Sequence, residues 1–243
     1  MKVIAFNSSP NMERGNTALI LNPFLKGMKD SGAEVELLYT YKMKIKPCRG
    51  EGNCMFKNPG RCFQQDDMNT LYPKLNADII IFASPLYWFG VSGTMKNLMD
   101  RMIPIGLPLL EIRNGRSGHP LREDKRVKGG KLVLVSNCGF WEMDNFDALV
   151  LQMKILCHHL DREFAGSLLR PHGPILRGML NTGTSTNDVL EAAEEAGRQL
   201  VKEGKIADLT LKAICRELIP LEAYIQGSNQ FIRQMLNRIC KDN

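Results

Sequence analysis

Five runs of apolar residues recur along the chain, and longer amphipathic stretches separate them. The runs lie at 2–6, 34–40, 78–85, 131–138 and 162–171. The stretches between them place apolar residues three and four positions apart, which is typical of helices that cover one face of a sheet. The run "DIIIFASP" at 78–85 is almost continuously apolar, as expected for a parallel strand buried on both faces. This alternation predicts an α/β fold with a doubly wound, five-stranded parallel sheet.

The same periodicity predicts the helices. We expect them at 17–32, 67–77, 90–102, 145–160 and 186–206. Pro73 limits the regularity of the second, Thr186 or Asn187 caps the last, and Gly204 ends it. Residues 171–185 are rich in Gly, Pro and Thr and are expected to form a link. The tail from 209 to 243 has a helical pattern interrupted at Pro220, and its apolar residues require a surface to cover.

Length and composition bound the domain organisation. The 243 residues, 44% hydrophobic, suit one domain at 1–205 and a helical arm at 206–243 that packs on the domain or on a partner subunit. No apolar run is long enough to span a membrane, and the N-terminus shows no secretory pattern, so we expect a cytoplasmic protein. The net charge of +6 has no nucleic-acid recognition motif beside it, so we expect no nucleic-acid partner.

The loop after the first run is longer than a strand-to-helix turn requires. It reads "SSPNMERGNT" from Ser8 to Thr17 and leads into a helix N-terminus. Hydroxyls of Ser8, Ser9 and Thr17, free backbone N–H groups and the helix dipole together predict an anion site, and Gly15 permits a close approach. The loop matches neither GxxxxGK[ST] nor GxGxxG, so it favours the phosphate monoester of a mononucleotide such as FMN.

Two further loops follow predicted strands. "SPLYWFG" begins at Ser84 and sets an aromatic cluster where side chains face solvent, which is typical of a binding surface for a flat ring. An oligomer interface is the other interpretation of Trp88. "SNCGFW" begins at Ser136, and Phe140 or Trp141 is expected to form another wall. Because carboxyl ends of parallel strands meet at one edge of a sheet, the three loops predict one crevice.

Together these residues resemble the NADPH-dependent FMN reductase and iron–sulfur flavoprotein group of the flavodoxin-like superfamily. The resemblance covers about residues 1–205 and rests on "SSPNMERGNT", "SPLYWFGVSGTMKNLMDR" and "PCRGEGNCMFKNPGRCFQQDDM". It implies a flavodoxin-like sheet of order 2-1-3-4-5, FMN as cofactor and NAD(P)H as co-substrate.

The resemblance also implies the residues that bind FMN. The phosphate would be held by Ser9, Asn11, Gly15, Asn16 and Thr17. The flavin ring would be lined by Pro85, Leu86, Tyr87, Trp88, Phe89 and Gly90, and its pyrimidine side by Asn137, Cys138 and Gly139. The loop departs from the pattern at Asn11, where many relatives have arginine.

Three of the seven cysteines, Cys48, Cys54 and Cys62, lie within fifteen residues. In the iron–sulfur flavoproteins that this insert resembles, four cysteines hold a [4Fe–4S] cluster, whereas here Glu51 stands at the place of the second ligand. Carboxylate is a harder ligand than thiolate. A cluster completed by Glu51 or a distant cysteine, a zinc ion, and a structural loop near the flavin without metal are the three interpretations, and we favour the last.

Two further expectations concern the aspartates after the insert and the cysteines outside it. Asp66 and Asp67 are expected to start the helix after the insert. The remaining cysteines, Cys138, Cys157, Cys215 and Cys240, are expected to be small apolar fillers.

The predicted function is an FMN-dependent NAD(P)H oxidoreductase that passes electrons to a quinone, flavin or other small acceptor. The alternatives are a flavin electron-transfer protein with a protein partner and a cofactor-free, flavodoxin-like interaction protein. No histidine lies clearly in the three loops, so no catalytic acid or base is assigned; His172 is the nearest exception. We expect a homodimer or homotetramer, and a lid or interface arm at Ile103–Gly130.

Overall fold

The computed structural model describes residues 1–184 and 186–239. Its main sheet has five parallel strands in the order β2-β1-β3-β6-β7. They are β1 (Lys2–Asn7), β2 (Glu34–Tyr39), β3 (Ile79–Pro85), β6 (Lys131–Asn137) and β7 (Glu163–Arg170). Numbered among themselves these strands have the order 2-1-3-4-5, so the predicted flavodoxin-like, doubly wound sheet is confirmed.

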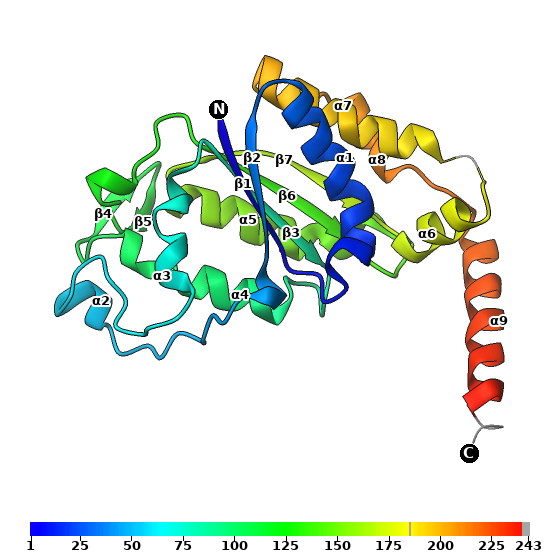
Figure 1. Ribbon diagram of the computed structural model, residues 1–243, viewed down its shortest axis with the longest axis horizontal. Coiled ribbons are helices and arrows are strands. Elements are labelled where there is room, and N and C mark those ends of the chain that lie inside the picture. The colour runs from blue at the N-terminus through cyan, green and yellow to red at the C-terminus, as the bar shows by residue number, and fades with distance from the viewer. Residues whose placement is uncertain (185, 240–243) are drawn as a thin grey trace.

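Helices cover both faces of the sheet (Figure 1). One layer consists of α1 (Asn16–Asp30) and α7 (Asn187–Glu203), and the other contains α3 (Met68–Leu71), α4 (Gly93–Asp100) and α5 (Asp147–His159). Alternate residues of β3 point into the two resulting cores, Ile79 and Ile81 into one and Ile80 and Phe82 into the other. This explains why the strand is continuously apolar.

Two of the predicted connections contain helices. Residues 171–185 were expected to be a link, but they include α6 (Gly173–Asn181). Its Gly173–Pro174 start is compatible with a helix, because the first N–H groups of a helix need no partner within it. The expected helix at 67–77 is shorter: α3 ends at Leu71, and a separate 3₁₀ turn follows at Lys74–Asn76 after Pro73. The cysteine insert adds α2 (Asn53–Phe56).

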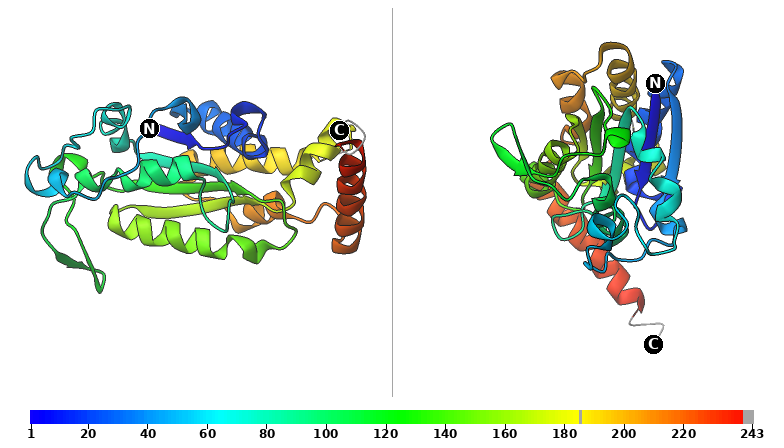
Figure 2. Two further views of the ribbon diagram at one scale, coloured as in Figure 1. Left: turned by 90° about the horizontal axis from the view of Figure 1, so that it is seen from below. Right: turned by 90° about the vertical axis from the view of Figure 1, so that its left-hand side faces the viewer.

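The long connection at 103–130 forms a hairpin of β4 (Glu111–Arg113) and β5 (Arg116–Gly118). Asn114 and Gly115 both have positive φ, which fits the tight turn that joins twisted antiparallel strands. The hairpin lies at the end of the molecule opposite α6 (Figure 1; Figure 2, left). Within the subunit it therefore cannot be a lid over the carboxyl ends of the strands; an interface arm stays a prediction.

The C-terminal region has two parts. Helix α8 (Asp208–Cys215) packs on α7 and β7 and buries Ile214 in the core. Helix α9 (Leu221–Ile239) projects away from the body and buries no side chain (Figures 1 and 2). Its exposed apolar residues are Ile225, Phe231, Ile232, Met235, Leu236 and Ile239. Cys240 lies outside the described residues, and within 1–184 and 186–239 no helix is both long and apolar enough to cross a membrane.

Candidate functional site

Three loops meet beyond the carboxyl ends of β1, β3 and β6 and enclose two adjoining pockets. A polar pocket of about 180 Å³ is lined by Ser9, Asn11, Asn16, Thr17, Pro85, Leu86, Tyr87, Asn137, Cys138, Gly139 and Pro174. An apolar pocket of about 500 Å³ is lined by Leu86, Tyr87, Trp88, Phe89, Cys138, Gly139 and Phe140. Leu86, Tyr87, Cys138 and Gly139 line both, so the pockets form one cleft. The structure thus brings together every FMN-binding residue that the resemblance implied except Gly15 and Gly90.

Gly15 and Gly90 do not line the pockets, but both shape the loops that do. A Cβ atom on Gly15 would lie 2.3 Å from the Oγ of Ser9, so only glycine leaves room for that side chain beside the helix start. The φ of Gly15 is negative, so space rather than backbone conformation requires glycine here. Gly90 and Tyr87 exchange two backbone hydrogen bonds of 3.0 Å, which close the aromatic loop.

The first loop forms a 3₁₀ turn at Met12–Arg14 before α1. Asn7 at the end of β1 accepts the N–H of Ser9 at 2.9 Å and sets the direction of the loop. Ser8 is buried, and its hydroxyl donates a hydrogen bond to the carbonyl of Ala83. Its role is therefore structural, and the expectation that its hydroxyl binds an anion is wrong. Ser9 and Thr17 do line the polar pocket, at the positive end of the α1 dipole.

The aromatic loop holds two side chains in an unusual backbone conformation. Trp88 and Phe89 both have positive φ, which bulky residues rarely adopt. Such strain costs about 1–3 kcal/mol per residue and gathers at functional sites. Its result is that Trp88 stands 95% exposed at the rim of the apolar pocket, with Phe89 beside it. The aromatic side chains therefore remain exposed to solvent, although burying them would stabilise the fold more, which is typical of a binding surface.

The third loop supplies the opposite wall. Cys138 is buried and its thiol donates to the carbonyl of Phe140 at 3.2 Å. Burial raises the pKa of the Cys138 thiol, so it stays protonated at neutral pH and is no nucleophile. Phe140 lines the apolar pocket as predicted, but Trp141 does not. The indole N–H of Trp141 donates to the carbonyl of Ile219, so this ring serves the C-terminal region instead.

A cluster at the base of α9 supports the third loop. His172 is buried with a positive φ, stacks with Trp141, and its Nε2 accepts the N–H of Leu218 at 3.2 Å. Burial, together with the nearby Arg170, lowers the pKa of His172 to about 4, which keeps the ring neutral. The hydroxyl of Tyr224 donates to the carbonyl of Gly139. The root of α9 therefore contacts a residue that lines both pockets.

Arg170 fixes the chain between α8 and α9. Its side chain is fully buried and donates to the carbonyls of Pro171, Ile214 and Arg216 at 2.8, 2.7 and 2.7 Å. No sequence motif predicted this role, because two of the acceptors lie more than forty positions away and all three are backbone atoms.

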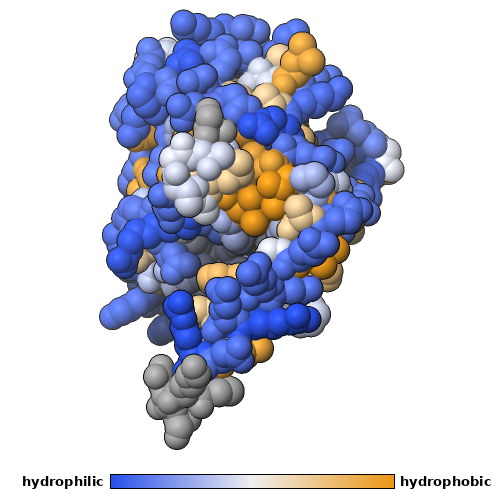
Figure 3. Space-filling model, turned by 90° about the vertical axis from the view of Figure 1, so that its right-hand side faces the viewer, coloured by the Kyte–Doolittle hydropathy of each residue, from blue (hydrophilic) through white to orange (hydrophobic). Residues whose placement is uncertain are grey.

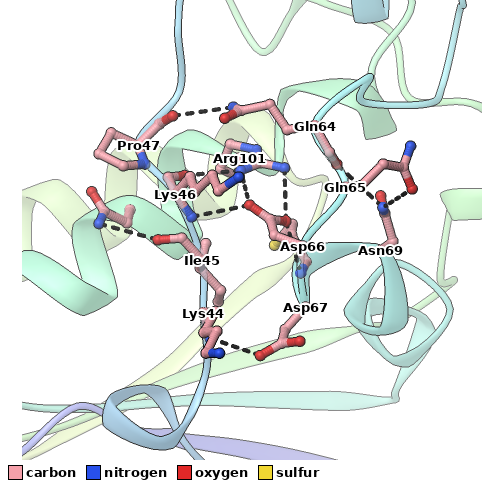
Figure 4. A network of polar contacts seen from close by, with 12 residues as sticks. Lys44, Ile45, Lys46, Pro47, Gln64, Gln65, Asp66, Asp67, Asn69 and Arg101 are labelled. Atoms are coloured by element: carbon pink, nitrogen blue, oxygen red, sulfur yellow. Dashed lines mark hydrogen bonds and ion pairs between the residues drawn. The ribbon is translucent and has the colours of Figure 1, made fainter.

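The cysteine insert is held by a buried ion pair (Figure 4). Arg101, the residue that follows α4, donates two hydrogen bonds to Asp66 at 2.7 and 3.1 Å, and the two side chains are 1% and 2% exposed. Asp66 also accepts the N–H of Lys46, and Asp67 that of Lys44. Burial alone would raise the pKa of Asp66, but the hydrogen bonds from Arg101 and Lys46 outweigh it and hold the pKa below its ordinary value.

These contacts correct the expectation for the two aspartates. Asp66 does accept the N–H of Met68 near the start of α3, but its main partners are Arg101 and the extended segment at 44–47. The pair therefore ties the two ends of the insert to α4 and to each other, in addition to capping a helix (Figure 4).

The three cysteines of the insert differ in how far they are buried. Cys54 and Cys62 are buried while Cys48 is exposed, and all three are free thiols. In the part of the chain that the structure describes, no group of three or more His, Cys, Asp or Glu side chains is arranged to hold a metal ion. Helix α2, which carries Cys54, lies at the opposite end of the molecule from α6 (Figure 1; Figure 2, left). Within one subunit, the expected position near the flavin is wrong, because α6 contributes Pro174 to the cleft.

A hollow of about 540 Å³ also lies at the amino ends of β1 and β2, near Lys2 and Glu34. Ligands of doubly wound folds bind beyond the carboxyl ends of the strands, so the cleft described above is the candidate site.

Comparisons with known proteins identify the family of the chain. A family model described as NADPH-dependent FMN reductase matches residues 1–137. An iron-sulfur flavoprotein of Archaeoglobus fulgidus is 28% identical over 220 residues, 90% of this chain and 94% of that protein. Another from the same organism is 39% identical over 119 residues, 48% of this chain. The match spans about half of that relative's length, 53%.

Solved structures show the same fold at low identity. An FMN-dependent NADH-azoreductase from Bacillus anthracis in complex with FMN has a TM-score of 0.58 and 14% identity, covering 83% of this chain and 99% of its own. The family model covers more than half of the chain and includes the first two loops of the cleft and the end of β6. The chain therefore belongs to the NADPH-dependent FMN reductase family, a family of flavin-dependent oxidoreductases.

Proposed function

We propose that the cleft binds FMN, with the phosphate in the polar pocket and the flavin ring in the apolar pocket. The donor chemistry supports this arrangement. Hydroxyls of Ser9 and Thr17 and the N-terminus of α1 line one end, and aromatic side chains line the other. An anion is stabilised at such a helix N-terminus. The volume of the apolar pocket alone is typical of small-molecule sites.

The proposed activity is that of an NAD(P)H oxidoreductase that passes electrons to a quinone, a flavin or another small acceptor. Bound FMN supplies the hydride-transfer chemistry, and the protein orients it and tunes it. No carboxylate, histidine or lysine of the described residues lines either pocket, and the Cys138 thiol is protonated. The lining residues of this chain therefore bind and orient the flavin.

The observation that carries the proposal is the continuity of a polar and an apolar pocket at the ends of three strands. The test starts from protein freed of flavin and titrated with FMN, followed by NADPH or NADH without oxygen. We expect tight FMN binding and loss of the visible flavin absorption on addition of the nicotinamide. Steady oxidation with a quinone or free flavin would then identify the class of acceptor.

Two outcomes would contradict the proposal in different ways. Protein that binds FMN but oxidises neither nicotinamide would be a flavin electron carrier with a protein partner. Protein that stays colourless with excess FMN would be a cofactor-free interaction protein.

We also propose that the chain is a homodimer, or a tetramer of two dimers, joined through the arm at 206–243. Helix α9 supports this, because its apolar residues Leu221, Ile225, Ile232, Met235 and Ile239 repeat at helical spacing and no side chain of α9 is buried. An apolar stripe of this kind is typical of helices that pair with another helix. In Figure 3 apolar side chains gather in a patch near the middle of the face at this end of the molecule, and smaller apolar areas lie around it.

Light scattering of the full chain tests the assembly. The Ile232→Glu variant should halve the mass, and Gln234→Glu, a charge on the same helix two residues away, should leave it unchanged. Equal masses for both variants and the wild type would place the interface elsewhere.

We further propose that residues 1–205 are the FMN-binding domain and that the protein is cytoplasmic. The six cysteines within the described chain are free thiols, which suits a reducing compartment.

A further inference from the structure

The polar pocket has no basic side chain in its lining. Its polar side chains are those of Ser9, Asn11, Asn16, Thr17, Tyr87 and Asn137, and none carries a positive charge. A phosphate monoester bears a charge of about −1.5 to −2 at neutral pH. Hydroxyls and a helix N-terminus stabilise an anion, but a guanidinium would add a stronger, charge-assisted hydrogen bond. If the proposed function is right, we expect a basic side chain near the residues that line the polar pocket.

Arg177 of α6 is placed to be that cation. Its Nε donates to the Oδ1 of Asn16 at 2.6 Å, and Asn16 is both the first residue of α1 and part of the pocket lining. The two residues are 161 positions apart in sequence. Pro174, less than one turn earlier on the same helix, also lines the pocket. The guanidinium is therefore joined by one hydrogen bond to a side chain that lines the polar pocket.

The same guanidinium has a donor without an acceptor. The Nη2 of Arg177 is buried and makes no hydrogen bond within 1–184 and 186–239, and no carboxylate of those residues forms an ion pair with the side chain. A buried charged donor left unpaired costs free energy, so an acceptor from outside the chain is expected. A phosphate oxygen is the acceptor that the planar fork of arginine suits best.

Arg14 is the other cation near the loop, and it differs in its surroundings. It belongs to the 3₁₀ turn at Met12–Arg14 and is exposed to solvent. An exposed side chain loses rotational freedom when it binds, and water screens its charge. Arg177 is already oriented by Asn16, so it has less to lose.

We propose that Arg177 recognises the phosphate of FMN, that Asn16 orients its guanidinium, and that it supplies the positive charge that the first loop lacks at Asn11. The inference rests on the proposed function and deepens it. It makes Arg177 a specificity-determining residue, which distinguishes FMN from riboflavin, the same flavin without its phosphate.

Dissociation constants for FMN and riboflavin test the assignment, with Arg177→Met, Arg177→Lys and the control Arg14→Met. Loss of one charged hydrogen bond should weaken FMN binding about 10- to 100-fold in Arg177→Met and leave riboflavin binding within about twofold. Arg177→Lys should recover part of the loss, because it restores the charge without the fork. Arg14→Met should bind both flavins as the wild type does.

Other outcomes overturn the inference. Equal weakening of both flavins in Arg177→Met would make its role structural, and unchanged FMN binding would remove it from the site. A loss confined to FMN in Arg14→Met, with Arg177→Met unaffected, would assign the phosphate to Arg14. Wild-type protein that binds neither flavin would overturn the proposed function itself, and thermal melting of each variant shows whether it is folded.

Discussion

The Nδ2 of Asn137 donates a hydrogen bond of 2.6 Å to the Oγ1 of Thr17, and both side chains are buried. The contact joins the end of β6 to the first turn of α1 across 120 positions of sequence. Both residues line the polar pocket. The bond therefore fixes the distance between the first and third loops, and with it the width of the cleft at its phosphate end.

Thr17→Val tests this contact at nearly constant shape. Valine cannot accept the hydrogen bond, so the buried amide of Asn137 loses its partner and the free energy of unfolding should fall by about 1–3 kcal/mol. FMN affinity should fall as well, because Thr17 no longer offers a hydroxyl. Urea denaturation and a fluorescence titration measure the two effects. A variant that unfolds and binds FMN as the wild type does would show that the contact is dispensable.

Gly15→Ala should damage the first loop through space alone. Its new methyl group would lie 2.3 Å from the Oγ of Ser9 and 3.3 Å from the carbonyl of Met12, so the Ser9 side chain must move out of the pocket lining. We expect FMN affinity to fall about tenfold or more, the effect of one lost charged hydrogen bond. Gly227→Ala is the matched control, since a Cβ there meets nothing within 4 Å and alanine favours a helix. Equal binding by both variants would contradict the prediction.

Trp88→Ala should affect binding without affecting stability. The side chain is 95% exposed and contributes little packing, and alanine at the same positive φ is no more strained. The melting temperature should stay within about 2 °C. The free energy of FMN binding should weaken by about 0.5–1.5 kcal/mol, because the variant loses one aromatic contact with the ring. Trp141→Phe should behave in the opposite way, because it loses the hydrogen bond to Ile219 away from the ring pocket. Calorimetry and titration of both variants provide the comparison.

Arg101→Met should destabilise the protein strongly. It leaves Asp66 buried without a counter-ion, which typically costs about 3–5 kcal/mol. Lys96→Met removes a single pair, with Asp100, that is exposed to solvent and should cost less than about 1 kcal/mol. Because neither Arg101 nor Asp66 lines the cleft, folded Arg101→Met should still bind FMN. Chemical denaturation gives the two free energies, and similar values would show that the buried pair contributes no more than a surface pair.

Stability should depend on pH through His172. Burial and Arg170 lower its pKa from 6.5 in the unfolded chain to about 4 in the folded protein. The unfolded chain therefore binds more protons between these values, and the free energy of unfolding should fall as the pH drops from about 6.5 to about 4. At about 1.36 kcal/mol per pKa unit the loss is at most about 3 kcal/mol. His172→Asn, which tolerates the positive φ and does not titrate, should show a flatter profile over this range.

The layers of the fold and the place of the cleft follow from local patterns. The five apolar runs predict the sheet, because a strand that carries helices on both faces has no position for polar residues. Each loop then follows from the strand before it, since parallel strands end at the same edge. Trp88 was expected at this edge for the same reason, with an oligomer interface as the other interpretation, and it lines the apolar pocket.

Local patterns failed where the contacts are distant in sequence or made by the backbone. Gly173 and Pro174 indicated a link, yet they begin α6, because tertiary packing of the buried Leu176 outweighs weak helical propensity. Arg170 and His172 meet carbonyl and amide groups near the root of α9, which have no sequence signature.

The amino-acid sequence by itself determined which segments are strands, that helices alternate with them, and which loops follow the strands at the edge of the cleft. These properties depend on the spacing of residues along the chain. Only the tertiary structure decided that Arg177 lies against Asn16, that Asp66 pairs with Arg101 inside the protein, and that α9 projects from the body. Such pairings depend on how elements pack in three dimensions, and the same local sequence is compatible with many of them.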